Sequence, residues 1–108
     1  MKLMVLTAAV FPSKAEARNK LWIFLRSCEK AGVPQEDLHL YGMGQGFPGY
    51  KHMMLDMQLD YLKQKGSGYT HVLFHDGWDG MFVASLNEVW GKYTAIGRPP
   101  MLISAFYQ

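Results

Sequence analysis

Cysteine is nearly absent from this 108-residue chain, which has one thiol, Cys28. A single cysteine excludes a disulfide within the chain and favours a reducing compartment. Cys28 lies inside a helical pattern, where we expect it to be a small core residue rather than a nucleophile.

Long hydrophobic runs and an excess of one charge are also missing. No stretch reaches the roughly 18 consecutive apolar residues of a membrane span, so we expect none. The formal net charge of +2 is too small to indicate binding to nucleic acid or to a membrane surface. With 49% hydrophobic and 19% charged residues, the composition is typical of one globular domain over residues 1–108.

The common phosphate-binding motifs are absent too. Residues 42–49 contain four glycines and one proline, which predicts a loop where the backbone turns sharply or approaches another group. No Gly-Lys-Ser/Thr follows, so it is not a P-loop, and its spacing is not that of a dinucleotide fingerprint. A generic phosphate cradle and a plain loop both remain open.

Apolar segments alternate with helical patterns along the whole chain. Residues 3–10, 38–43, 72–74 and 101–106 are predicted strands. Ser-x-x-Glu capping boxes begin the first and third predicted helices at Ser13 and Ser85. The apolar start could also pass for a short signal peptide, but the capped helix that follows favours a first buried strand.

The helical patterns also predict which faces are buried. In the first helix, Leu21, Phe24, Leu25 and Cys28 form one stripe, which Trp22 and Ile23 widen. In the second helix, over residues 50–65, the predicted spine consists of Leu55, Leu59 and Leu62, with Met54 and Tyr61 beside them.

This order predicts an α/β fold with three Rossmann-like layers. The sheet is expected to be mostly parallel, with right-handed crossovers and helices on both faces. The last predicted strand lies close to the end of the given sequence, and its edge must be covered by something. Oligomerisation through that strand, with a second copy or another protein, is therefore one expectation.

Two carboxylates follow the third predicted strand. Val72-Leu73-Phe74 reads as a buried strand and stops at Asp76 and Asp79, which have Trp78 between them. Ligands of open α/β sheets bind at the carboxyl ends of strands, and carboxylates can hold a divalent cation that bridges to phosphates. A solvated Asp-Gly turn is the alternative reading. His75 could reach such a site, or could simply be a hydrogen-bonded strand residue.

Six stretches in order resemble one family, the N-terminal glycosyltransferase domain of the procollagen lysyl hydroxylases and the related collagen galactosyltransferase-like proteins. The match runs from Leu3 to about Ala105, which is nearly the whole chain. They are Leu21-Trp22-Ile23-Phe24-Leu25-Arg26-Ser27, Leu40-Tyr41-Gly42-Met43-Gly44, Gly49-Tyr50-Lys51, Leu73-Phe74-His75-Asp76-Gly77-Trp78-Asp79, Ser85-x-x-Glu88-x-x-x-Lys92 and Ile103-Ser104-Ala105.

The resemblance implies the N-terminal half of a GT-A-like nucleotide-diphospho-sugar transferase fold, with a UDP-sugar donor and a hydroxyl acceptor such as a sugar or hydroxylysine. It implies that Asp76 and Asp79 bind Mn²⁺ or Mg²⁺. The implied nucleotide contacts are Trp78 near the nucleotide, Lys51 at the start of the second helix, and Ala8 and Val10 near uracil and ribose. A lysine in the first turn of a helix suits a phosphate.

The departures from the family leave other readings open. Val10 replaces the family's threonine, and the glycine loop is shorter and contains Phe47-Pro48. The family's third metal ligand and its acceptor-binding half lie beyond Gln108, so the chain is expected to be a fragment or a donor-binding half. A non-catalytic structural or interaction domain is the main alternative. A receiver- or flavodoxin-like domain, with Asp76 in the position of a phospho-acceptor, is a third and less favoured reading, because neither a fifth strand nor a lysine loop is found.

Overall fold

The computed structural model describes residues 2–44, 51–75, 77 and 80–101. Within them the chain forms alternating strands and helices: β1 (Leu3–Ala8), α1 (Lys14–Ala31), a short 3₁₀ turn η1 (Gln35–Asp37), β2 (Leu38–Tyr41), α2 (Lys51–Lys65), β3 (His71–Phe74) and α3 (Leu86–Ala95). The first three predicted strands and all three predicted helices are confirmed. Residues 102–106 of the fourth predicted strand lie outside the described residues.

The strands form one all-parallel sheet in the order β2-β1-β3. Val5 of the central strand pairs with Leu38 on one side and with Leu73 on the other. A central parallel strand is covered on both faces, and Met4, Val5 and Leu6 are fully buried. The chain is thus a small α/β domain whose described sheet is compatible with the predicted Rossmann-like layout.

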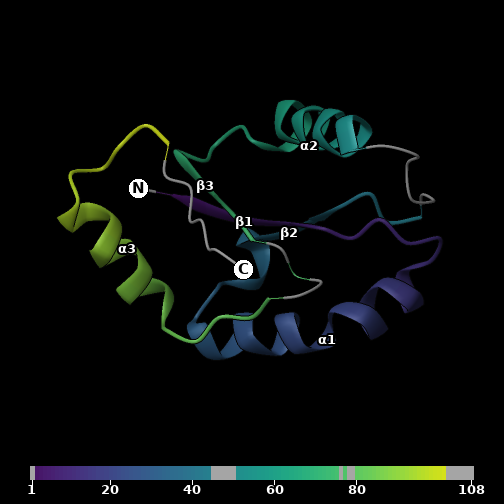
Figure 1. The fold of residues 1–108 in the computed structure, drawn as a ribbon, viewed down its shortest axis with the longest axis horizontal. Helices are drawn as coiled ribbons and strands as arrows, with labels where there is room; N and C mark the ends of the chain where they lie inside the picture. Colours follow the sequence, from purple (N-terminus) through teal and green to yellow (C-terminus); the bar gives the residue numbers. More distant parts are fainter. Residues whose placement is uncertain (1, 45–50, 76, 78–79, 102–108) are drawn as a thin grey trace.

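Successive β1 side chains point to opposite faces of the sheet and meet different helices. Val5 belongs to a cluster with Phe24 and Cys28 of α1, whereas Leu6 packs with Tyr41 of β2 and Tyr61 of α2. Figure 1 shows α1 and α2 on opposite sides of the sheet, with α3 beyond β3. The prediction of helices on both faces is therefore confirmed.

Local signals place the helix ends as predicted. The Ser13 hydroxyl accepts a hydrogen bond from the Glu16 amide at 3.1 Å, and the Ser85 hydroxyl accepts one from the Glu88 amide at the same distance. Each serine satisfies an amide that has no partner within its helix. Gly32 ends α1 at φ +84°, a left-handed conformation that glycine adopts easily.

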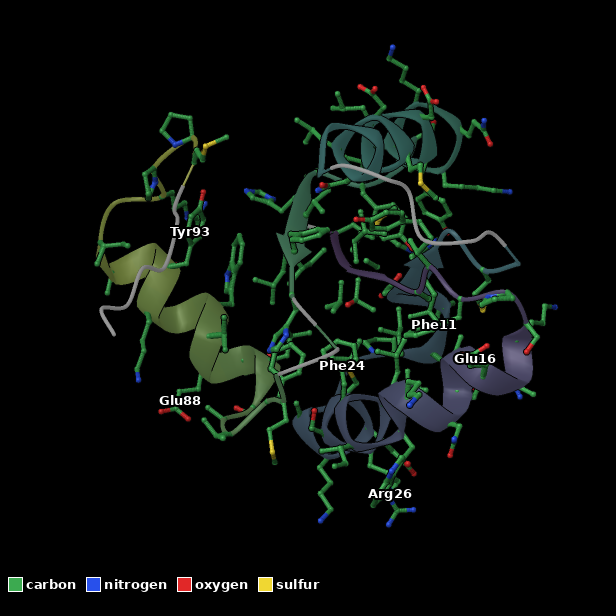
Figure 2. All side chains as sticks on the ribbon, turned by 45° about the vertical axis from the view of Figure 1, so that its right-hand side comes forward. Phe11, Glu16, Phe24, Arg26, Glu88 and Tyr93 are labelled. Carbon is green, nitrogen blue, oxygen red and sulfur yellow. The ribbon has the colours of Figure 1, made fainter. Side chains whose placement is uncertain are left out.

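The predicted faces of α1 and α2 are only partly correct. Figure 2 shows Phe24 pointing from α1 into the core and Arg26 pointing away from it. Trp22 and Ile23, which were expected to widen the buried stripe, are exposed, as are Leu55 and Leu59 of the predicted α2 spine. Leu62 of the predicted spine does pack against the core cluster, together with Tyr61, which was predicted beside the spine, and Met57, which was not predicted. The Tyr61 hydroxyl lies 2.6 Å from Nδ1 of His39, so a polar contact also holds this face of α2 against the sheet.

β3 is also less buried than its apolar sequence predicts. Leu73 packs against the cluster beneath α1, but Val72 and Phe74 on the other face are 43% and 45% exposed. The reason is that the α2-side cluster is built on β1 and β2, with Met4, Leu6 and Tyr41 at its centre. That face of β3 therefore lies at the margin of the cluster, where the ring centroid of Phe74 is 6.2 Å from that of Tyr41.

Candidate functional site

The carboxyl ends of β1 and β3 form the edge of the sheet where a ligand is expected. The chain leaves β1 toward β2 on one side, and β3 lies on the other side. The strand order thus reverses between β1 and β3, and open α/β sheets bind ligands at such a reversal. The His75 amide continues the pairing beyond β3 by donating to the Leu6 carbonyl at 3.0 Å.

The predicted metal ligands lie outside the described residues. This applies to Asp76 and Asp79 and also to Trp78 between them. Among the residues that the structure describes, no three histidine, cysteine or acidic side chains come together as a metal site. The divalent cation remains a prediction.

Two of the other predicted site residues, Ala8 and Val10, lie at the carboxyl end of β1. Ala8 ends β1 and pairs with Tyr41 at the end of β2. Val10 follows and is buried, with 8% of its surface exposed. Lys51 is the first residue of α2, and the start of a helix favours anions. The structure therefore brings Ala8 and Val10 together at the edge and gives Lys51 the helix position that was predicted.

Buried hydroxyl groups hold the connection from β3 to α3. The Gly77 amide donates to Oγ1 of Thr7 in β1 at 2.9 Å, and the Phe82 amide donates to Oγ of Ser27 in α1 at 2.9 Å. Thr7 is fully buried and Ser27 is 5% exposed. The backbone of Gly77 is thereby held against Thr7, the residue that precedes Ala8 in β1.

Sequence reasoning passed over both hydroxyl residues. Thr7 interrupts an otherwise apolar strand, and Ser27 lies beside the buried stripe of α1. A buried polar side chain needs a hydrogen-bond partner, so each predicts a polar contact. The identity of that partner could not be read from the sequence, because both amides are more than 50 residues away.

His75 packs into the core beside this connection. Its ring centroid lies 4.8 Å from that of Phe24 and 5.0 Å from that of Phe82. The imidazole is therefore a packing element on the α1 side, where it helps to seat the backbone that follows β3.

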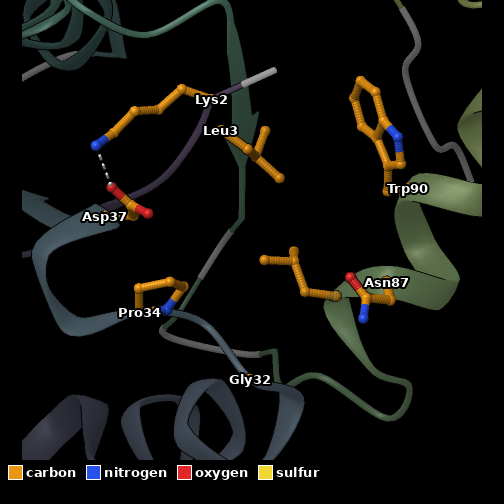
Figure 3. Close-up of a pocket in the computed structure, with 8 residues that line it drawn as sticks. Lys2, Leu3, Gly32, Pro34, Asp37, Asn87 and Trp90 are labelled. Atoms are coloured by element: carbon orange, nitrogen blue, oxygen red, sulfur yellow. Dashed lines mark ion pairs between the residues drawn. The ribbon is translucent and has the colours of Figure 1, made fainter.

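A cavity of about 280 Å³ adjoins the end of β2. It is lined by Tyr41, Gly42, Met57, Asp60, Tyr61 and Gln64. A second cavity, of about 330 Å³, lies at the opposite end of the strands, beside Lys2 and Leu3 (Figure 3). Trp90 forms one wall there, and the ion pair of Lys2 with Asp37, 3.7 Å between Nζ and Oδ1, lies across from it. Only the smaller of these two cavities is near the candidate edge.

A polar network occupies the side of the sheet near α2. Tyr61 and Tyr69 hydrogen bond to the two ring nitrogens of His39, at 2.6 and 3.0 Å. The Tyr69 hydroxyl also donates to the Glu36 carbonyl at 3.1 Å and to Oδ1 of Asp37 at 3.0 Å. Burial raises the pKa of Tyr61, and burial together with the hydrogen bond to Asp37 raises the pKa of Tyr69. Both phenols stay protonated at neutral pH. Tyr61 ties α2 to His39 of β2, and Tyr69 ties the segment between α2 and β3 to the same imidazole.

In comparisons with protein-family models, curated proteins and solved structures, no match was found. None of the described helices has the length and apolar character needed to cross a bilayer.

Proposed function

We propose that this domain binds a UDP-sugar through a divalent cation, as the donor-binding half of a GT-A-like glycosyltransferase. Asp76 and Asp79 would hold Mn²⁺ or Mg²⁺, Trp78 would lie beside the nucleotide, and Lys51 would contribute charge for the diphosphate. Ala8 and Val10 would lie near the base and ribose. The cation would supply charge stabilisation to the leaving diphosphate when the sugar passes to a hydroxyl acceptor.

The observation that carries the proposal is the hydrogen bond from the Gly77 amide to the Thr7 hydroxyl, at 2.9 Å. It fastens the centre of the Asp-x-x-Asp sequence to β1 at the edge where the strand order reverses. α2 begins after β2, and in a parallel α/β unit the helix that follows a strand begins at the carboxyl end of the sheet. The positive end of α2 is thus expected on the same side as the turn. A glycine that only made the turn flexible would not need the buried Thr7 hydroxyl as a hydrogen-bond partner.

Calorimetry with UDP and Mn²⁺ tests the proposal directly. We expect a dissociation constant on the order of 1 mM or tighter, lost on adding EDTA and weakened at least about 10-fold in Asp79→Asn and in Asp76→Asn. Asp56→Asn is the matched control, since Asp56 is an exposed carboxylate of α2. Heats that are absent, that persist in EDTA, or that are the same in Asp79→Asn and Asp56→Asn contradict the proposal.

A non-catalytic interaction domain is the second candidate, and the open face of β3 favours it. Val72 and Phe74 are each more than two-fifths exposed, and apolar side chains in neighbouring positions of one strand face can mark a protein contact. Light scattering over a range of protein concentrations distinguishes the two candidates. A dimer that dissociates in Phe74→Ser, without UDP binding, supports this candidate. A monomer that binds UDP contradicts it.

A further inference from the structure

The path from β3 to α3 is fastened twice before the helix begins. Gly77 is held by Thr7 of β1, and Phe82 is held by Ser27 of α1, each through an amide-to-hydroxyl hydrogen bond of 2.9 Å. Thr7 belongs to the sheet and Ser27 belongs to α1. The backbone at Gly77 and at Phe82 is therefore held by two different elements of the core.

These hydroxyls lie where apolar side chains would serve the core equally well. Thr7 is in the central strand with neighbours Leu6 and Ala8, and it has no exposed surface. An unpaired hydroxyl in such a place is destabilising, whereas valine has nearly the same shape. Ser27 already donates to the Phe24 carbonyl at 2.7 Å, so its bond from Phe82 uses the remaining acceptor capacity. Both hydroxyl oxygens thus accept a hydrogen bond from the connection, and Ser27 does so in addition to its bond within α1.

Gly77 is matched to this arrangement. A Cβ at Gly77 would lie 2.8 Å from Oγ1 of Thr7 and 2.9 Å from Cδ2 of Phe24. Only a residue without a side chain lets the backbone come close enough to the sheet for its amide to reach Thr7. Close approach, a buried acceptor and a glycine thus occur together between the two acids of the sequence.

We propose that Thr7 and Ser27 are positioning residues for ligand binding: they hold the β3–α3 connection in place before the ligand arrives. This inference rests on the proposed function, because Asp76 and Asp79, the proposed metal ligands, lie on either side of Gly77 in the sequence. When the connection is already ordered, binding does not include the free-energy cost of ordering a loop, and the affinity is therefore higher.

Amide exchange measured by NMR on the intact chain tests the positioning directly. In Thr7→Val we expect the Gly77 amide to exchange about 10-fold faster or more, relative to the Met4 amide in the same strand as Thr7. A merely structural effect would speed both amides together. Thr7→Ser keeps the acceptor and restores the Gly77 rate. In Ser27→Ala the Phe82 amide is the one that accelerates, which provides a second test if Thr7→Val folds poorly.

UDP and Mn²⁺ titrations of the same variants complete the test. We expect affinity to fall at least about 5-fold in Thr7→Val and in Ser27→Ala, and to recover in Thr7→Ser. Binding that is lost in Asp79→Asn but unchanged in Thr7→Val and Ser27→Ala overturns the positioning role alone. Unchanged exchange at Gly77 in Thr7→Val, or equal effects of Thr7→Val and Thr7→Ser, also overturns it. A wild-type chain that binds no UDP overturns the proposed function, and the exchange measurement then still decides whether Thr7 anchors the connection.

Discussion

Val10 lies directly against Gly42. A Cβ at Gly42 would be 2.6 Å from Cγ2 of Val10 and 3.0 Å from Cε of Met57. Beside this contact, the Ala9 amide donates to the Tyr41 carbonyl at 2.8 Å. Gly42 therefore lies where the end of β1, the end of β2 and the inner face of α2 meet.

Gly42→Ala should destabilise the domain more than Gly44→Ala. Both glycines have φ +84°, so both variants are strained by about 1–2 kcal/mol. Only Gly42 is enclosed, since a Cβ at Gly44 would meet nothing within 4 Å, and overpacking adds about 1–3 kcal/mol. Urea unfolding of the two variants measures the difference. Equal losses would mean that Val10 and Met57 move aside without cost.

Gly77→Ala should lower the free energy of unfolding by about 1–3 kcal/mol, because a Cβ would collide with Thr7 and Phe24. Gly91→Ala is the matched control. Gly91 lies in α3, where an added Cβ would meet nothing within 4 Å, and alanine in a helix interior is about 0.5–1 kcal/mol better than glycine. In thermal or urea unfolding, Gly77→Ala should thus lower the free energy of unfolding and Gly91→Ala should raise it. A neutral Gly77→Ala would contradict the close approach.

Stability should fall at alkaline pH through Cys28. Burial raises the pKa of its thiol to about 11, whereas an unfolded thiol titrates near 8.5. The unfolded state therefore loses this proton first, and the contribution of Cys28 is complete below about pH 8.5 and declines as the pH rises toward 11. Between pH 8.5 and 10 we expect a loss on the order of 1–2 kcal/mol.

Cys28→Ala provides the comparison for this titration. Tyrosine and lysine titrations are common to both proteins, so the difference in the pH slope of the unfolding free energy isolates the thiol. Parallel slopes between pH 8 and 10 would show that the thiol is not desolvated.

The effects on stability of substituting Tyr61 and Tyr69, which both contact His39, should be coupled. Tyr61→Phe and Tyr69→Phe each keep the ring and remove a hydrogen bond to His39, which should reduce stability by about 1–2 kcal/mol. Because both share one imidazole, the double variant should differ from the sum by at least about 0.5 kcal/mol. Tyr93→Phe is the control, since its hydroxyl donates to the Pro99 carbonyl, away from His39. Tyr69→Phe with Tyr93→Phe should be additive, and additivity of the His39 pair would contradict the network.

Interactions within a few residues were readable from the sequence. The serine caps at Ser13 and Ser85, the left-handed Gly32 and the three described strands depend on local spacing and on backbone preference, which the chain carries at each position. β1 and β2 nevertheless end two residues earlier than predicted, at Ala8 and Tyr41, because an apolar run does not report where pairing stops.

Contacts between distant residues were decided only by the tertiary structure. α2 carries apolar side chains on two flanks, and its packing brought Met57, Tyr61 and Leu62 against the cluster of Tyr41 while leaving Leu55 and Leu59 exposed. The sequence likewise marked the turn after β3 but not its anchor, since Thr7 and Gly77 are 70 residues apart. Local preference limits each segment to a few conformations, and the burial of apolar surface and pairing of buried polar atoms across the sheet then select one of them.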